Sequence, residues 1–544
     1  MTQASSGATR QQIDKNQAVA LCKQALEGNR LGDAYKLLDA LMQNGVLQLD
    51  LARDFFKRSL TVGDDATPAT MLARFIELAP NNLGVHQLAM NFYEATAQWN
   101  KIPFHLDRCK ALGHWTDYQV LLSAIVEERT LNSEKALAIL DKAFPPELQP
   151  NVWRIRADAW NALRDDDNLL GPLQEYLAAY EGDHRLIAHS WKAVAAAYDR
   201  KKDFANAEKT LKLANAMQYR LEGVPVQRNA LRMMIEGFKK RFTREWVDGW
   251  TPSVPHDQAP VFLIGFPRSG TTLLEQVLDS HPDIVAIEEK QTVSPCFRSA
   301  NLVCESMAAV AGKPPEGASW LQLMQRRLNY LARFSEKQLR ELQALYFRQV
   351  AKYIDLKPGQ TLIDKMPLNS AYVGFIARMF PNARFIVALR HPADCVLSGH
   401  MQSFQMNDAM SNFLVLDDGA SFYRHVMKLL WQYEEVLGLK DRMHYIRYED
   451  LIGDLEGTVT PLLEFLGLDW DAGMANYAEH AKGRGSLATP SYQAVGKGLY
   501  TASRYRWHNY ADYLRPVLPH LQEAAERYGY SLEMPEQGAD TASQ

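Results

Sequence analysis

The sequence predicts a multidomain protein in which an all-helical solenoid precedes an α/β domain with a mostly parallel sheet. Three observations support this prediction. The chain has 544 residues, which is too long for a single hydrophobic core. Residues 14 to 218 are rich in Ala and Leu at the three- and four-residue spacing of helices. After Pro255, short apolar runs alternate with helical patterns, which is typical of βα units.

The helical region contains an internal repeat. From Ala188 to Tyr219, large and small apolar residues follow the spacing of a tetratricopeptide (TPR) repeat. These residues are Trp191, Val194, Ala195, Tyr198, Ala207, Leu211 and Ala214. Weaker copies precede this unit, so we expect a TPR-like solenoid with a concave face. Two roles stay open for this region. It can dock a peptide or partner on that face, or it can act as a spacer or dimerisation arm.

Changes in composition set the expected domain limits. We expect a disordered tail at residues 1–13, TPR-like repeats at 14–218, a helical linker at 219–258, the α/β domain at 259–532 and a disordered tail at 533–544. Pro252 and Pro255 end the linker because proline cannot continue a helix. Within the α/β domain, continuous apolar runs suit buried parallel strands at residues 260–264, 361–363, 384–389 and 443–446.

Charge and composition exclude several classes of protein. The chain has 60 Lys and Arg against 64 Asp and Glu, so we expect no nucleic acid as partner. The first 17 residues lack the apolar core of a secretory signal, and no later apolar run has the length of a membrane span. The five cysteines lack metal-ligand spacing, and their odd number favours a reducing, cytoplasmic compartment. We predict no metal site, because the sequence does not group His281, His391 and His400 with cysteines or acidic residues.

A glycine-rich turn follows the first predicted strand of the α/β domain. Gly265 and Gly270 flank this turn, and an amphipathic helix begins directly after it. A turn of this kind cradles an anion, because backbone N–H groups and the helix dipole point at one spot. Thr271 stands where a nucleotide-binding P-loop has Lys, which argues against an ATPase or a GTPase. A nucleotide kinase is therefore a weaker alternative.

The turn resembles the donor-binding loop of the P-loop-type sulfotransferases, because residues 267–272 read Pro-Arg-Ser-Gly-Thr-Thr. In that family the loop holds the 5′-phosphosulfate of 3′-phosphoadenosine 5′-phosphosulfate (PAPS). The resemblance extends over about residues 260 to 530 and implies a sulfotransferase domain. The residues that it implies for binding the phosphosulfate are Arg268, Ser269, Gly270, Thr271 and Thr272.

The segment from Leu278 to Lys290, which contains the Glu-Glu pair at residues 288 and 289, resembles the segment of the protein-tyrosine sulfotransferases that follows their loop helix. The resemblance implies that Glu289 is the general base. A hydroxyl acceptor must in any case lose its proton to a nearby group as its oxygen attacks sulfur. Glu288 is expected to be a surface carboxylate. The chain has Gln291 where the tyrosine enzymes have Arg, which weakens tyrosine as the acceptor more than it weakens sulfuryl transfer.

Two further motifs resemble the same family. Lys365, at the end of a predicted strand, matches the lysine that stabilises charge on the leaving phosphate, while Asp364 is expected to be a cap. Arg390 and Ser398, eight residues apart, match the pair that binds the 3′-phosphate of the donor. The pair matters for the identity of the donor because ATP has no 3′-phosphate.

Two later segments match the family less sharply. Glu449, after the last predicted strand, is expected to be a helix cap. Lys497 and Tyr500 are candidates for the late loop that covers the donor nucleotide.

Together these motifs predict an enzyme that transfers a sulfuryl group from PAPS to a hydroxyl and releases 3′-phosphoadenosine 5′-phosphate (PAP), without a metal. The catalytic residues would be Glu289, Lys365 and Arg268. Protein tyrosine, docked by the TPR-like region, is one candidate acceptor; a carbohydrate, a lipid or a small phenol is the alternative. A non-catalytic TPR scaffold and a homodimer stay open.

Overall fold

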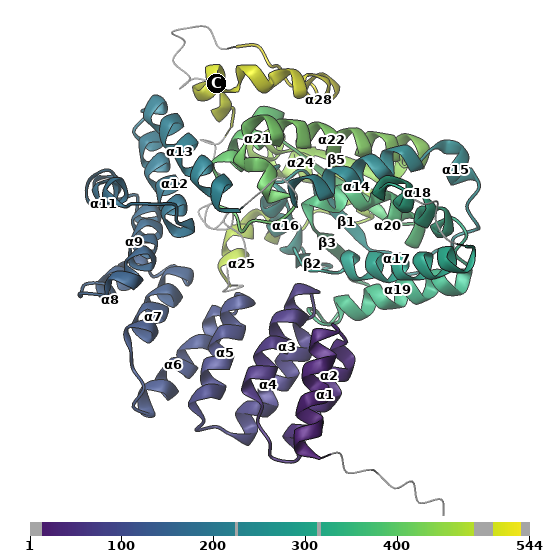
Figure 1. Cartoon of the computed structure of the whole chain (residues 1–544). Helices are drawn as coiled ribbons and strands as arrows, with labels where there is room; N and C mark the ends of the chain where they lie inside the picture. Colours follow the sequence, from purple (N-terminus) through teal and green to yellow (C-terminus); the bar gives the residue numbers. More distant parts are fainter. Residues whose placement is uncertain (1–13, 223–226, 313–316, 484–503, 535–544) are drawn as a thin grey trace, which may run out of the picture. The chain divides into compact units, whose positions relative to one another are not determined.

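A computed structural model describes residues 14–222, 227–312, 317–483 and 504–534, with the side chains of 222–230 and 481–483 left aside. The chain divides into two compact units, residues 1–131 and 132–544. The predicted domain limits differ from this division and stay predictions. The fold class is confirmed, because helices alone form the described N-terminal region and a parallel sheet with helices follows it (Figure 1).

The first unit consists of short helices packed in sequence order. Its core contains Phe55, Phe56 and Phe75, each at most 3% exposed. The helices are α1 (Lys15–Glu27), α2 (Leu31–Gln43), α3 (Leu49–Thr61), α4 (Ala66–Leu78), α5 (Leu83–Ala95), α6 (Ile102–Ala111) and α7 (Asp117–Arg129).

The second unit begins with further helices, of which α12 and α13 carry the predicted repeat. The small residues Ala207 and Ala214 are fully buried, which lets paired helices approach closely. The helical spacing is thus confirmed, and the assignment to the TPR class stays a prediction. These helices are α8 (Ser133–Ile139), α9 (Gln149–Leu163), α11 (Gln174–Ala179), α12 (Arg185–Arg200) and α13 (Phe204–Glu222).

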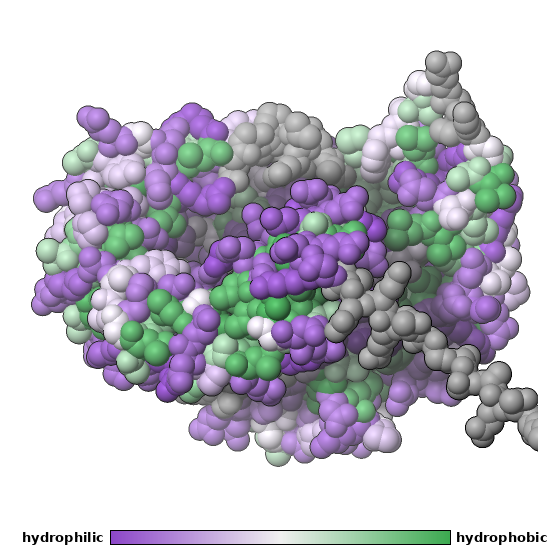
Figure 2. Space-filling view, turned by 60° about the horizontal axis from the view of Figure 1, so that its bottom comes forward, coloured by the Kyte–Doolittle hydropathy of each residue, from purple (hydrophilic) through white to green (hydrophobic). Residues whose placement is uncertain are grey.

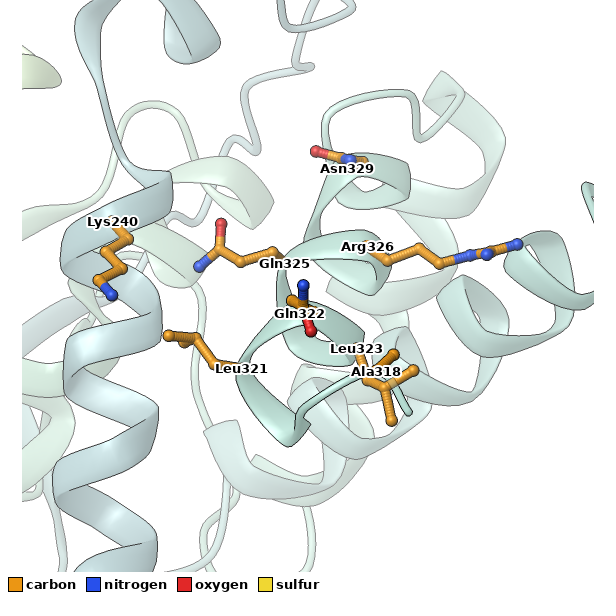
Figure 3. A pocket seen from close by; sticks show the side chains of 8 residues that line it. All are labelled: Lys240, Ala318, Leu321, Gln322, Leu323, Gln325, Arg326 and Asn329. Carbon is orange, nitrogen blue, oxygen red and sulfur yellow. The ribbon is translucent and has the colours of Figure 1, made fainter. Parts of the chain in front are cut away.

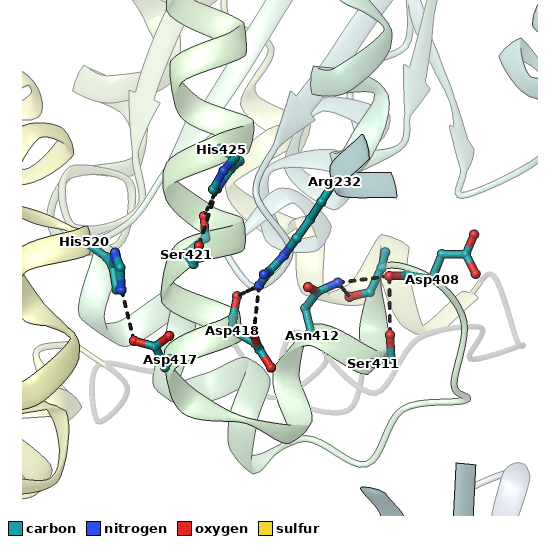
Figure 4. A network of polar contacts seen from close by, with 10 residues as sticks. Arg232, Asp408, Ser411, Asn412, Asp417, Asp418, Ser421, His425 and His520 are labelled. Atoms are coloured by element: carbon teal, nitrogen blue, oxygen red, sulfur yellow. Dashed lines mark hydrogen bonds and ion pairs between the residues drawn. The ribbon is translucent and has the colours of Figure 1, made fainter. Parts of the chain in front are cut away.

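Helix α14 (Gln227–Arg241) belongs to the packing of the α/β domain, although it precedes the sheet in sequence. Phe238 and Phe242 are at most 1% exposed and join the core beside the sheet. Arg232 donates a hydrogen bond to the carbonyl of Asp418, near the start of α22 (Leu416–Val436; Figure 4). The short α15 (Arg244–Asp248) follows α14.

Within the described part of the chain, five parallel strands form the sheet, in the order β2-β3-β1-β4-β5. The strands are β1 (Val261–Gly265), β2 (Ile284–Glu288), β3 (Thr361–Lys365), β4 (Arg384–Leu389) and β5 (Met443–Arg447). The central β1 is buried along its whole length, as its continuous apolar run predicts. Because all strands run in the same direction, the residues that follow them gather at one edge of the sheet.

Helices cover both faces of the sheet (Figure 1). Phe262 and Ile264 of β1 point into one apolar cluster, and Val261 and Leu263 point into the other. The second cluster contains α16 (Thr271–Asp279), α23 (Tyr448–Gly453) and α24 (Leu455–Leu466). The first contains α17 (Val293–Val310), α18 (Trp320–Leu331), α19 (Glu336–Val350), α20 (Val373–Met379), α21 (Pro392–Met401) and α22 (Leu416–Val436).

The described surface is mixed in polarity. Figure 2 shows hydrophobic residues in separate patches among hydrophilic ones. Among the described residues, none of the helices combines the length and the apolar character needed to cross a bilayer. All five cysteines are buried free thiols.

Candidate active site

The turn between β1 and α16 is tightly packed, which explains its two glycines. A Cβ atom on Gly265 would lie 2.6 Å from the carbonyl oxygen of Ala388. Gly270 has φ +93°, and a Cβ there would lie 2.6 Å from the ring of Tyr448. Arg268 also adopts a left-handed backbone, with φ +73°. Because such conformations cost non-glycine residues free energy, the fold holds this turn in one specific shape.

The turn presents polar groups suited to an anion. The hydroxyl of Ser269 is buried and has no hydrogen-bond partner among the described residues. Thr271 and Thr272 form the first turn of α16, where backbone N–H groups have no partner within the helix. An anion at this position would satisfy these donors and would meet the positive end of the helix dipole.

Arg268, Arg390 and Ser398 come together beside the turn. Arg268 Nε donates to Ser398 Oγ at 3.1 Å, and Arg390 Nη1 lies 3.4 Å from the carbonyl oxygen of Arg268. Burial and the nearby guanidinium of Arg390 lower the pKa of Arg268 to about 10. Burial also acts to lower the pKa of Arg390, yet Asp394 holds it above its ordinary value. Both side chains therefore remain cations at neutral pH.

Lys365, at the end of β3, is the centre of a cluster of carboxylates. Its Nζ lies 2.9 Å from Glu289 Oε1, 3.1 Å from Glu275 Oε2 and 3.7 Å from Glu288 Oε1. The side chains of Lys365 and Glu275 are fully buried, whereas that of Glu289 is 36% exposed. Burial acts to lower the pKa of Lys365, but the carboxylates hold it above its ordinary value. The lysine is therefore a buried, permanent cation.

The backbone fixes Glu289 next to Lys365. Strands β2 and β3 pair in register up to Glu288 and Lys365, and the N–H of Glu289 donates to the carbonyl of Lys365 at 2.8 Å. Glu289 has φ +46°, which turns the chain sharply out of the strand. Its side chain can thus face both Lys365 and solvent, the placement that an acceptor hydroxyl would require.

Residues 260–472 match the family described as "Sulfotransferase family". This region is a sulfotransferase-family domain.

Relatives of the sulfotransferase domain include enzymes with different acceptors. The chain is 25% identical to protein-tyrosine sulfotransferase 1 of Danio rerio over 42% of its length and 59% of the relative. It is 26% identical to omega-hydroxy-beta-dihydromenaquinone-9 sulfotransferase Stf3 of Mycobacterium tuberculosis, over 42% and 54% of the two chains. An uncharacterized protein of Aquifex aeolicus is 29% identical over 62% of this chain and 41% of its own. The chain thus spans about half the length of these relatives.

Two solved structures also resemble this chain. The sulfotransferase domain of the olefin synthase from Synechococcus PCC 7002 aligns with 52% of this chain and 99% of its own, at 19% identity and a TM-score of 0.33. Sulfotransferase STF9 from Mycobacterium avium aligns over 68% and 98%, at 15% identity and a TM-score of 0.30.

The expectation that Asp364 is a cap is wrong. Its side chain is fully buried and accepts hydrogen bonds from Thr292 Oγ1 at 2.5 Å and Tyr346 Oη at 2.8 Å. Burial raises the pKa of Asp364 to about 6. Thr292 lies three residues after Glu289, so this contact ties the segment that follows the candidate base to β3. Asp364 thus has a structural role, because it holds the segment after Glu289 against β3.

Glu449 acts as a cap, but at the start of α21 and not of its own helix α23. Its carboxylate accepts from the backbone N–H of His391 at 2.9 Å and from Tyr530 Oη at 2.8 Å. The sequence shows that Glu449 follows a strand, but it does not show that His391 and Tyr530 lie beside it. Glu449 thus holds the start of α21, the helix that carries Ser398.

Sequence reasoning missed two residues of the site. Glu275 lies on α16 among apolar neighbours, and a glutamate on the buried side of an amphipathic helix is the signal that could have found it. Tyr448 packs over Gly270, with the guanidinium of Arg390 5.0 Å from its ring centroid. Lys497 and Tyr500, the two candidates for the late loop, lie outside the described residues.

A surface pocket of about 530 Å³ lies away from these residues, between α14 and α18 (Figure 3). Lys240 faces it from α14, and Gln325 and Arg326 line it from α18. Arg326 already donates to two backbone carbonyls, and Gln325 donates to that of Gly237. None of the residues that line this pocket is a predicted site residue of the sulfotransferase domain.

Proposed function

We propose that this protein transfers a sulfuryl group from PAPS to the hydroxyl of an acceptor and releases PAP. One observation carries the proposal. Three cations lie at the carboxyl ends of strands: Arg268 after β1, Lys365 as the last residue of β3 and Arg390 after β4. The carboxylate of Glu289 lies 2.9 Å from Lys365 Nζ. Cations that can bind an anionic donor and a carboxylate that can take up a proton therefore lie at the same edge of the sheet.

The residues present fit the donor. The unpartnered hydroxyl of Ser269 and the N-terminal turn of α16, with Thr271 and Thr272, suit the 5′-phosphosulfate. Arg268 supplies a cation to the same group. Arg390 and Ser398 are proposed to bind the 3′-phosphate, because a guanidinium offers two parallel donors to a phosphate. With these cations in place, the scheme needs no metal.

The proposed reaction is a direct displacement at sulfur. The acceptor oxygen forms a bond to sulfur while the bond between sulfur and the oxygen of the 5′-phosphate breaks. Glu289 takes the proton of the hydroxyl, and PAP leaves with the bond's electron pair. Lys365 stabilises the negative charge that develops on the leaving phosphate.

The acceptor is proposed by class. A protein tyrosine is one candidate, because the Glu-Glu segment resembles that of the tyrosine enzymes and the Danio rerio relative is named a protein-tyrosine sulfotransferase. The name of the mycobacterial relative instead describes a lipid-like quinone. Gln291 is exposed beside Glu289 and is the residue that departs from the tyrosine enzymes. A carbohydrate, lipid or small phenol is therefore the alternative acceptor.

Two measurements test the proposal. Isothermal titration calorimetry should detect binding of PAP and little binding of ATP with magnesium; the reverse preference would favour a nucleotide kinase. Incubation of the protein with ³⁵S-labelled PAPS and a cell extract should then move label into a protein, glycan or small-molecule fraction. A non-catalytic scaffold would leave all of the label in the donor.

The variant Glu289→Gln tests the assignment of the base. It keeps the size of the side chain, so PAP binding should persist while turnover falls about 10²- to 10⁴-fold. Glu288, expected to be a surface carboxylate, is only 14% exposed and lies 3.7 Å from Lys365 Nζ. Glu288→Gln therefore removes a more distant carboxylate of the same cluster, and as a comparison variant it should lose much less turnover. Normal turnover by Glu289→Gln would contradict the assignment.

A further inference from the structure

Helix α21 connects the two residues proposed to bind the 3′-phosphate. It begins at Pro392, two residues after Arg390, and it carries Ser398. Its position therefore sets the distance between the guanidinium and the hydroxyl. Whatever holds the two ends of α21 also holds this half of the site.

The C-terminal end of α21 is held by helices of the repeat region. Lys192 of α12 donates from Nζ to the carbonyl of Gln402 at 2.7 Å. Asn215 of α13 donates from Nδ2 to the carbonyl of His400 at 3.1 Å. The last carbonyls of a helix have no partner within it, so these two side chains cap α21 from a different part of the chain. Both are buried, at 6% and 2% exposure.

The N-terminal end of α21 is held through the turn at residues 506–510. The carboxylate of Asp394, in the first turn of α21, accepts from the backbone N–H of Trp507 at 2.8 Å. The same carboxylate lies 3.8 Å from Arg390 Nη2. The ring of Trp507 stacks on His391, with centroids 5.0 Å apart and planes inclined by 15°.

Asp199, near the end of α12, holds that turn in place. Its carboxylate accepts from Tyr510 Oη at 2.6 Å and pairs with Arg506 Nη2 at 2.7 Å. Phe204 of α13 packs edge-on against the ring of Tyr510 at 5.4 Å. The side chain of Asp199 is only 16% exposed. A continuous series of contacts thus runs from Asp199 through Trp507 and Asp394 to Arg390.

We propose that helices α12 and α13 are a structural part of the donor site and that Asp199 is a positioning residue for the 3′-phosphate. This inference rests on the proposed function and deepens it. It gives the repeat helices a role other than docking a partner or acting as a spacer. Asp199 acts through Arg390, so its loss should weaken recognition of the 3′-phosphate specifically.

The experiment compares two ligands on two variants. PAP and adenosine 5′-phosphate (AMP) differ only in the 3′-phosphate. Asp199→Asn weakens the contacts to Arg506 and Tyr510, and we expect it to raise the Kd of PAP about 3- to 30-fold, which lies within the range of coupling between residues of one contact network. The Kd of AMP, measured by competition, should stay unchanged.

A matched control comes from the same helix pair. Asp183, just before α12, accepts two hydrogen bonds of 2.7 Å from Arg220 of α13 and lies at the opposite end of α12 from Asp199. Asp183→Asn should leave the affinities for PAP and AMP at the wild-type values. Tyr510→Phe, which removes one hydrogen bond to Asp199 and keeps the ring, should shift PAP affinity in the same direction by less. It serves as the test if Asp199→Asn does not fold.

The outcomes separate the two proposals. If the wild-type protein does not bind PAP, the proposed function fails and the inference fails with it. If the wild-type protein binds PAP and Asp199→Asn binds it equally well, only the inference is overturned. An equal loss of affinity for PAP and AMP would also overturn it, because that pattern indicates general loosening.

Discussion

Replacing Lys365 by methionine should reveal two separate roles of this lysine. Methionine fills a similar volume but leaves Glu275, which is fully buried and 3.1 Å from Lys365 Nζ, without that cation. Removing one partner of a buried ion pair costs about 3–5 kcal/mol. That is a large part of the roughly 5–15 kcal/mol by which a domain is stable. Lys365→Met should therefore unfold at a clearly lower guanidinium concentration than the wild-type protein.

A second change separates stability from catalysis. Adding Glu275→Gln to Lys365→Met removes the buried charge, and the double variant should recover most of the lost free energy of unfolding. It should not recover turnover, because the charge of Lys365 no longer stabilises the leaving phosphate; a loss of about 10²- to 10³-fold is expected. Equilibrium unfolding by tryptophan fluorescence and turnover of labelled PAPS are the two assays.

The pH dependence of the single variant gives a third check. A buried carboxylate without a cation has a raised pKa, so the folded state takes up a proton before the unfolded state does. Stability of Lys365→Met should therefore rise as pH falls from 8 to 5, by at most about 1.4 kcal/mol per pH unit. In the wild-type protein the carboxylates hold the pKa of Lys365 above its ordinary value, so its contribution is constant in this range. A stable single variant, or an active double variant, would refute the reasoning.

Two other changes test the turn and the first unit. Gly270→Ala places a methyl group 2.6 Å from the ring of Tyr448 at φ +93°, so it should lower the free energy of unfolding by about 1–3 kcal/mol and weaken PAP binding. The control Gly438→Ala, at φ +60° in open space, should lower the free energy of unfolding by about 1 kcal/mol and leave PAP binding intact. Burial lowers the pKa of His105 to about 4, so its contribution to stability is present above pH 6.5 and is lost as pH falls toward 4. His105→Asn should reduce the loss of stability over this range in denaturation curves, and an unchanged pH dependence would contradict the assignment.

Much of the fold follows from local sequence. The continuous apolar run of β1 predicts a buried parallel strand because both of its faces must be covered, and the structure has it at the centre of the sheet. Gly265 and Gly270 are likewise predictable, since a tight turn before a helix has few other solutions. The order of the strands is not a local property, and no pattern within β3 indicates that it lies between β2 and β1.

Several residues of the candidate site can be picked out from sequence motifs, but the connections between them cannot. Arg268 and Lys365 stand out because each lies at a strand end within a recognisable motif. The pairing of Lys365 with Glu275 joins segments 90 positions apart, and the contact of Asp199 with Tyr510 joins segments 311 positions apart. Sequence spacing carries no information about such distances. Asp364 was misjudged for the same reason, since its partners come from two other segments.

The pairing of β2 with β3 has a consequence for how this protein can diversify. The candidate base and its cation are set by the register of two neighbouring strands and by one backbone hydrogen bond, from Glu289 to Lys365. The long connection between them, with α17, α18 and α19, does not determine their separation. Changes at exposed positions of this connection, such as Leu302 and Trp320, can therefore alter the surface of the domain while the spacing of base and cation stays constant. Tyr346 is not free to change in this way, because its hydroxyl donates to Asp364.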